Sequence, residues 1–385
     1  MDFYSTNSLS WDKLEYGTTN IQNLHYGLIH VGLPTMVDID KDNLPNIIDG
    51  NVPKNYELCK EGDIVFADAS EDTNEVAKAV EYYNLNGKKV VCGLHTIHGR
   101  DNKNKTVVGY KGYAFSSMSF HHQIRRIAQG TKIYSINSKN FSECYVGIPS
   151  KDEQQKIADL LRLIDERIAT QNKIIEDLKK LKSAIIENVF DDKHSERLQL
   201  DNVGSYIRGL TYSSNDVVEH GGTLVMRSNN IVNGSLLDYN NNVVFVNKQM
   251  SAEQQLQNGD IVICMANGSS SLVGKSSFYD GNWHSPITVG AFCGIYRSKE
   301  PIVKWLFQTN KYRRYIWNSL QGGNGAIANL NGEDILNMSF SIPNAPIKDT
   351  CVKMLTSVDS ALENNMSLCA LYTLQKQHLL RQMFI

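Results

Sequence analysis

The sequence has no Cys-x-x-Cys pair, no long apolar run and no strong excess of charge of either sign. Its seven cysteines are scattered, which is typical of reduced core thiols and not of a disulfide framework or a zinc cluster. No basic segment followed by an apolar run opens the chain, so we expect an untargeted, soluble protein of the cytoplasm. A formal net charge of −2 means that any nucleic-acid binding must depend on local patches or on a partner.

Motifs of common catalytic sites are also missing. The segment "NGSSSLVGKSS" (267–277) suggests a phosphate-binding loop, but the required first glycine falls on Ser269, and the turn-rich "FYDGNWHSP" follows where a helix is needed. His95 and His98 in "HTIH" have no third ligand nearby in the sequence. Neither a Gly-x-Ser-x-Gly elbow nor the Asn-Pro-Pro-Tyr or Asp-Pro-Pro-Tyr motif of adenine methyltransferases occurs. We therefore predict no catalytic site and no metal.

Two stretches that begin with Ile-Pro align without a gap, residues 148–190 with residues 342–384. Identical residues include Asp165 and Asp359, and Lys182 and Lys376. In both copies the apolar residues recur at alternating steps of four and three, the pattern of a coiled-coil seam. The predicted seam comprises Ile157, Leu161, Ile164, Ile168, Ile175, Leu178, Leu355, Val358, Leu362 and Leu379.

An amide interrupts each seam at the same place, Gln171 in the first copy and Asn365 in the second. Such residues fix register at a cost in stability, and we expect the two to lie opposite each other. Ser150 and Glu153 predict a capping box, and a helix of about 40 residues would be about 60 Å long. A core helix of a bundle is the alternative, but two such helices separated by a whole domain favour antiparallel pairing.

The repetition continues into the segments before the helices. "GDIVFADASEDTNEVAK" (62–78) matches "GDIVICMANGSSSLVGK" (259–275), and short Val/Ile/Tyr runs between Gly, Asn and Asp clusters predict strands. We therefore predict an α+β protein with two tandem strand-rich domains, each followed by a long helix, the two helices pairing as an antiparallel coiled coil. The predicted boundaries are 1–148, 149–193, 194–342 and 343–385.

Charge is arranged alike in the two domains. Residues 1–75 carry 4 basic against 14 acidic side chains and residues 76–142 carry 11 against 2, while 195–272 carry 4 against 7 and 273–332 carry 7 against 2. The second part of each domain is therefore basic. Two basic regions held apart by long helices suit duplex DNA with two half-sites, separated by at most about 18 base pairs.

At this point the chain resembles the specificity subunit of type I restriction-modification enzymes. The resemblance is carried by "IPSKDEQQKIADLLRLIDERI…LKKLKSAIIENVF", its weaker copy "IPNAPIKDTCVKMLTSVDSAL…LLRQMF", "GDIVICMANGSSSLVGK" and "MRSNNIVNG". It implies a non-catalytic subunit of a bacterium or archaeon, in which each of two target-recognition domains reads one half of a bipartite DNA site. The paired helices would set the spacing and dock two methyltransferase subunits.

The resemblance also implies that cofactors belong to the partners. S-adenosylmethionine is expected on the methyltransferase subunits and ATP on up to two restriction subunits, with none bound by this chain. The second helix departs from the family pattern, because "PNAPIKDTC" replaces the Glu-Gln-Gln-Lys-Ile of the first. How tightly this copy packs or docks a methyltransferase subunit therefore stays open.

Candidate DNA contacts are basic or amide side chains in polar loops or at helix ends, where phosphate and base edges are bound. Each also has an ordinary explanation as a solvated lysine, an Asn-rich turn or surface charge. The candidates are Lys78, Arg100, Lys103, Lys105, Arg125, Arg126, Arg227, Asn229, Lys275, Arg313 and Arg314.

Two other classes of function compete with DNA recognition. One is a scaffold whose domains bind glycans or peptides, although a glycan binder has little use for the charge division. The other is an enzyme built around the Gly-Lys-Ser loop, which requires ATP binding by the isolated chain.

Overall fold

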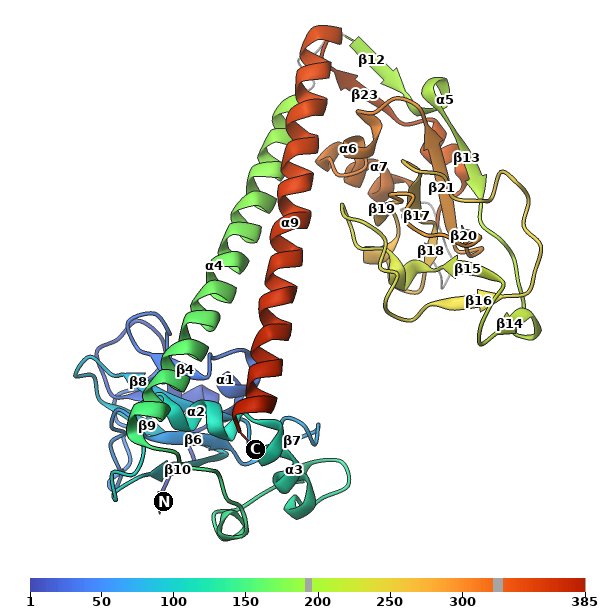
Figure 1. The fold of residues 1–385 in the computed structure, drawn as a ribbon. Helices are drawn as coiled ribbons and strands as arrows, with labels where there is room; N and C mark the ends of the chain where they lie inside the picture. The colour runs from blue at the N-terminus through green and yellow to red at the C-terminus, as the bar shows by residue number, and fades with distance from the viewer. Residues whose placement is uncertain (191–195, 321–327, 385) are drawn as a thin grey trace. The chain divides into compact units, whose positions relative to one another are not determined.

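The computed structural model describes residues 1–190, 196–320 and 328–384. The chain divides into two compact units, the first made of Met1–Lys173 with Met366–Ile385 and the second of Ile174–Asn365. Both units combine sheets with helices, as an α+β fold requires (Figure 1). The two long helices, α4 (Lys151–Val189) and α9 (Ala345–Met383), each contribute one part to each unit. Among the described residues, no helix is long and apolar enough to span a bilayer.

The first unit contains a five-stranded sheet of order β1-β10-β6-β8-β4, a four-stranded sheet of order β2-β5-β3-β9 and the pair β7-β11. Its strands are β1 (Asp2–Tyr4), β2 (Leu14–Glu15), β3 (Gln22–Leu24), β4 (Met36–Asp38), β5 (Asn46–Ile47), β6 (Ile64–Ala67), β7 (Ala69–Ser70), β8 (Ala79–Asn84), β9 (Val90–Cys92), β10 (Thr96–Arg100) and β11 (Tyr134–Ser135). Its short helices are η1 (Trp11–Lys13), α1 (Tyr26–Val31), α2 (Tyr110–Phe115), α3 (Met118–Ile127) and η2 (Asn140–Glu143). Every residue of β6 is buried, which explains its unbroken apolar sequence.

The second unit has a sheet of order β13-β21-β17-β19, a second of order β14-β16-β15-β20, and the pairs β18-β22 and β12-β23. Its strands are β12 (Glu196–Gln199), β13 (Gly204–Arg208), β14 (Val217–Val218), β15 (Thr223–Met226), β16 (Val244–Val246), β17 (Ile261–Cys264), β18 (Ala266–Asn267), β19 (Ser276–Phe278), β20 (Ile287–Val289), β21 (Cys293–Ser298), β22 (Ala328–Asn329) and β23 (Ser339–Ile342). Its short helices are α5 (Leu200–Val203), η3 (Ser214–Asp216), η4 (Ser228–Asn230), η5 (Ser270–Leu272), α6 (Val303–Leu306), α7 (Asn310–Leu320) and α8 (Gly332–Leu336).

The strand pairings show that the two units repeat one plan. The isoleucine of each Gly-Asp-Ile-Val motif is the first residue of a strand, β6 in the first unit and β17 in the second. Each of these strands lies between two antiparallel neighbours. The other four-stranded sheet of each unit, which contains β3 in the first and β15 in the second, ends in a parallel pair, β3 with β9 and β15 with β20. The sequence repeat therefore corresponds to a repeat of strand order and strand direction.

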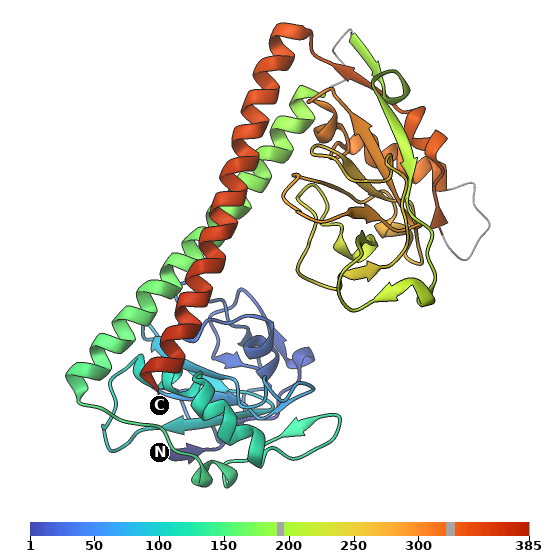
Figure 2. The same ribbon diagram turned by 45° about the vertical axis from the view of Figure 1, so that its right-hand side comes forward.

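In the first unit, the start of α4 packs beside the end of α9 and against α2 (Figures 1 and 2). Leu161 is fully buried in one apolar cluster with Tyr113 and Phe384. Asp165 accepts a hydrogen bond from the Tyr113 hydroxyl at 2.9 Å and pairs with Lys376 Nζ at 2.6 Å. Further along α4, Asn172 Oδ1 lies 3.3 Å from Cys369 Sγ. Because residue numbers rise along α4 as they fall along α9, the two helix segments are antiparallel here.

The second unit shows the same contacts with the roles of the helices exchanged. Leu355 is fully buried in a cluster with Trp305 and Ile186. Asp359 of α9 accepts a hydrogen bond from Trp305 Nε1 at 3.1 Å and pairs with Lys182 Nζ of α4 at 2.7 Å. Lys304 Nζ lies 2.9 Å from the other carboxylate oxygen of Asp359. Burial lowers the pKa of Lys182, and the charge of Asp359 opposes that shift.

The predicted seam residues all lie on protected faces of the two helices. Ile157, Ile168, Leu178 and Leu379 are half-buried, whereas Leu161, Ile164, Ile175, Leu355, Val358 and Leu362 are buried. Gln171 is half-buried in the first unit, where the neighbouring Asn172 contacts Cys369. Asn365 belongs to the second unit, and its amide donates to the Ala361 carbonyl oxygen of its own helix at 2.7 Å. A role of either amide in setting register stays a prediction.

Replacing Asp359 with alanine should destabilise the second unit strongly, because it leaves the buried ammonium of Lys182 without its carboxylate. We expect a loss of about 3–5 kcal/mol in the free energy of unfolding, measured by urea denaturation. The control is Glu176→Gln on α4. It removes an exposed ion pair between Glu176 and Lys180 and should leave the free energy of unfolding unchanged. Equal effects of the two substitutions would contradict a structural role for the buried pair.

Candidate nucleic-acid interface

The candidate lysines Lys78 and Lys275 occupy the same turn in the two units. Ala67 N donates to the Lys78 carbonyl oxygen at 3.0 Å, and Cys264 N donates to that of Lys275 at 2.9 Å. The preceding residue has a positive φ in both turns, 59° at Ala77 and 82° at Gly274. Glycine adopts this conformation without strain, and alanine adopts it at a cost. The turn therefore places both lysines at the same point of the fold.

The surroundings of the two lysines differ. Lys78 Nζ pairs with Glu75 at 2.8 Å, whereas the residue at the corresponding place before Lys275 is Leu272. Lys275 lines a cavity of about 220 Å³ together with Arg313 and the exposed Trp317. The second unit therefore presents two cations and an indole ring around one hollow.

An arginine from the following helix approaches the same loop in the first unit. Arg125 Nη1 of α3 donates to Asn74 Oδ1 at 2.9 Å. A helix arginine thus lies near the loop in each unit: Arg125 contacts Asn74 in the loop before Lys78, and Arg313 lines the same cavity as Lys275. The neighbouring Arg126 and Arg314 are exposed on α3 and α7.

A second cavity in the second unit contains the other pair of candidates. It has a volume of about 460 Å³ and is lined by Arg227, Asn229, Tyr212 and Phe292, whose side chain is 65% exposed. Arg227 Nη2 donates to the Asn242 carbonyl oxygen at 2.9 Å, while its buried Nε has no hydrogen-bond partner in the part of the chain that the structure describes. Arginine and asparagine are the side chains that bind guanine and adenine edges through paired hydrogen bonds. This cavity therefore has the chemistry of a base-contacting site.

Arg100 has a different environment from the other candidates. It is buried at the end of β10, where Nε and Nη2 donate to the two carboxylate oxygens of Asp63 at 2.8 Å each, and Nη2 also donates to the Leu58 carbonyl oxygen at 2.8 Å. Glu57 lies against Nη1. These acceptors occupy the guanidinium, which leaves Arg100 a structural role.

The same clamp recurs in the second unit, where Arg297 Nε donates to Asp260 Oδ1 at 2.8 Å. The aspartate of each Gly-Asp-Ile-Val motif also caps a turn, accepting from Lys60 N at 2.8 Å in the first unit and from Gln257 N at 2.7 Å in the second. Burial opposes ionisation of Asp63, but hydrogen bonds from His98 and Arg100 outweigh it and lower its pKa. Sequence reasoning missed this clamp, although the aspartate and its arginine are the same number of residues apart in both units, Asp63 to Arg100 and Asp260 to Arg297.

Lys103 and Lys105 are exposed in the loop that follows β10. This loop is fixed to the start of α4 by Gln154, which is fully buried. Gln154 Oε1 accepts from Val107 N at 3.0 Å, and its Nε2 donates to the Lys105 carbonyl oxygen at 3.1 Å. The glutamine of the "DEQQK" segment thus joins the helix to the basic loop, a role that the heptad pattern did not reveal.

The Gly-Lys-Ser segment does not have the geometry of a phosphate-binding loop. Gly274 N is occupied by the Cys264 carbonyl oxygen at 2.8 Å, and strand β19 follows where such a loop needs a helix N-terminus. The positive φ of Gly274 serves packing as well, because an added Cβ would lie 2.7 Å from Ile316.

Comparisons with known proteins agree with the resemblance found in the sequence. The family model of the type I restriction modification DNA specificity domain matches residues 42–180. The EcoKI specificity subunit of Escherichia coli (strain K12) is 35% identical over 155 residues, which are 38% of this chain and 31% of that protein. Residues 42–180 of the chain are therefore similar to this DNA specificity domain. The StySPI specificity subunit of Salmonella potsdam is 34% identical over 153 residues, which are 38% of this chain and 31% of that protein.

The matches to these two family members span about a third of their length. A solved structure covers more of the molecule, the type I restriction-modification system S subunit from M. genitalium. The structural alignment covers 100% of this chain and 93% of the chain of that S subunit, with a TM-score of 0.61 and 15% sequence identity. The specificity-subunit fold therefore extends beyond the region in which sequence similarity is detectable.

Replacing Arg100 with lysine should lower the stability of the first unit, because an ammonium cannot donate the paired hydrogen bonds that Asp63 accepts. We expect a loss of about 2–4 kcal/mol in the free energy of unfolding, measured by urea denaturation. Lys103→Ala and Lys105→Ala, in the exposed loop that follows, should leave stability unchanged. If all three variants are equally stable, the assignment of Arg100 to a clamp is wrong.

Proposed function

We propose that this chain is the non-catalytic DNA-recognition subunit of a type I restriction-modification complex. Each unit recognises one half of a bipartite duplex site, and no base between the halves is specified. The observation that carries this proposal is the repeated module, in which a lysine occupies the same turn in both copies and a helix arginine lies near that loop. The match of residues 42–180 to the type I restriction modification DNA specificity domain supports it, as does the basic character of the second part of each module.

The spacer in this proposal is the pair of long helices. Each is 39 residues long, or about 58 Å, and we propose that they pair antiparallel along their whole length as a coiled coil. The reciprocal contacts Asp165 with Lys376 and Lys182 with Asp359 support that pairing. A spacer of this length corresponds to an unread gap of at most about 17 base pairs.

The outer faces of the helices suit the docking of methyltransferase subunits. Large apolar side chains are exposed on both helices: Leu160, Leu163, Ile174 and Leu181 on α4, and Ile347, Met354, Met366, Leu368, Leu371 and Leu374 on α9. Helix faces of this kind are typical of protein partners. In this proposal two methyltransferase subunits supply S-adenosylmethionine chemistry and up to two restriction subunits supply ATP-driven cleavage, while this chain binds neither cofactor.

Co-expression with a candidate type I methyltransferase subunit from the same organism tests the proposal. Plasmid DNA from such cells should carry methylated adenines in one motif with two specified halves and an unspecified gap. The two proteins should also copurify. Copurification without a two-part motif, or a single continuous motif, would contradict recognition by two separate modules.

Substitutions at the two cavities should act on one half-site only. In the complex, Arg227→Ala should relax the preference at one base pair by about 1–3 kcal/mol, and Lys275→Ala should weaken binding to all sequences and reduce the salt dependence by about one phosphate contact. Binding is measured by fluorescence anisotropy with duplexes altered in either half.

Lys78→Ala is the matched control, because Glu75 already neutralises this lysine and its loss should have a smaller effect than loss of Lys275. A change of specificity in both half-sites after Arg227→Ala would exclude independent modules.

A further inference from the structure

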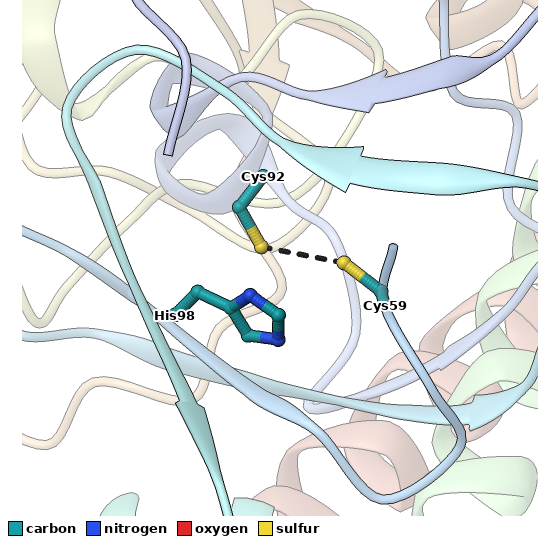
Figure 3. A group of neighbouring side chains, drawn as sticks. All are labelled: Cys59, Cys92 and His98. Carbon is teal, nitrogen blue, oxygen red and sulfur yellow. Dashed lines mark hydrogen bonds between the residues drawn. The ribbon is translucent and has the colours of Figure 1, made fainter. Parts of the chain in front are cut away.

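Three metal-binding side chains converge in the core of the first unit. Cys59, Cys92 and His98 are all buried, and one ligand atom from each lies within 4.8 Å of the others (Figure 3). The two sulfur atoms are 3.4 Å apart. The three residues come from the segment before β6, from β9 and from β10, so an ion held here would join three segments of the chain.

The imidazole of His98 is oriented as a metal ligand. Its Nε2 lies 2.7 Å from Asp63 Oδ2. Because Asp63 Oδ2 also accepts a hydrogen bond from Arg100 Nη2 at 2.8 Å, the carboxylate acts as an acceptor and His98 Nε2 donates to it. The other ring nitrogen, Nδ1, is buried, has no hydrogen-bond partner among the described residues and points toward the sulfur atoms in Figure 3. A carboxylate that fixes the second nitrogen of a ligating histidine is common in metal sites.

The positions of the second unit that are equivalent to these three contain residues that serve packing only. Cys59 N donates to the Val90 carbonyl oxygen, and Leu256 N donates to that of Ile287, so Cys59 corresponds to Leu256. By the strand registers, Cys92 corresponds to Val289 and His98 to Ile295. All three residues of the second unit are buried aliphatic side chains. The first unit has thus exchanged three aliphatic positions for two thiols and an imidazole at one point.

A fourth donor adjoins the cluster. The Tyr82 hydroxyl is buried beside both thiols and interacts with Cys59. The hydroxyl of its counterpart Tyr279 instead donates to the Trp283 carbonyl oxygen at 3.4 Å. Nδ1 of His98, which has no hydrogen-bond partner among the described residues, and the hydroxyl of Tyr82 therefore lie beside the same two sulfur atoms.

We infer that Cys59, Cys92 and His98 bind one thiophilic divalent cation, with zinc the best fit, and that the Tyr82 hydroxyl adjoins its fourth position. Two thiolates and an imidazole are ligands that zinc prefers in tetrahedral sites. The ion satisfies Nδ1 of His98 and links the segment before β6 with β9 and β10. Its role is structural, because all three ligands are buried and, among the described residues, none of them lines a cavity that contains a DNA-contact candidate.

Metal analysis of the full chain, purified without chelator from cells supplied with zinc, tests the inference. We expect about one zinc per chain, and cobalt substitution should give the absorption of a thiolate-ligated tetrahedral ion. Removal of the metal with a chelator should lower the melting temperature of the protein. Absence of zinc and cobalt from the folded chain, or a disulfide between Cys59 and Cys92 in freshly purified protein, would overturn the inference.

Two variants separate the site from non-specific binding of metal. The triple variant Cys59→Leu, Cys92→Val and His98→Ile copies the residues of the second unit and should retain less than about a tenth of the metal. Cys293→Ser removes a buried thiol of the second unit, which contacts Cys264 strand to strand, and should keep the full metal content. Equal metal content in the triple variant and the wild type would overturn the assignment of ligands, even if the triple variant is less stable.

Discussion

One aspartate of each long helix makes the contact on which the arrangement of the helices depends. In the first unit the half-buried Asp165 pairs with Lys376 and accepts a hydrogen bond from the Tyr113 hydroxyl, and in the second the buried Asp359 pairs with Lys182 and accepts one from Trp305 Nε1. Each carboxylate therefore joins three elements: its own helix, the other long helix and a helix of the module. Because an unpaired buried charge is costly, Asp359 requires both its lysine and its aromatic donor in place. This geometry fixes the antiparallel direction locally in each unit.

The repeated pattern of the sequence was the strongest source of prediction. Identical pairs such as Asp165 with Asp359, and the alternation of apolar residues, predicted two long helices with protected faces, which α4 and α9 have. Prediction was weaker wherever a side chain chooses between several partners in space. Arg100 was a plausible phosphate contact in "GRDNKNK", but Asp63 and Glu57 lie far from it in the sequence and only the fold brings them to it.

The two modules share a backbone plan but differ in the chemistry placed on it. Glu75 neutralises Lys78, whereas Leu272 leaves Lys275 beside Arg313 at a cavity. In the core, Cys59, Cys92 and His98 stand where the second unit has Leu256, Val289 and Ile295. A duplicated scaffold that is held by the same aspartate–arginine clamps can vary its surface and core independently. Such variation is what the proposed recognition of two different half-sites would require.

The central claim is that the paired helices set the distance between two independent DNA-recognition modules. The most direct measurement is methylation mapping with a chain that carries one added heptad in α4 and one in α9, both at the level of the Asn172–Cys369 contact. Seven residues preserve the seam and lengthen a helix by about 10 Å. The account predicts the same two half-sites with a gap longer by up to about three base pairs. An unchanged gap, or altered bases within the halves, would contradict it.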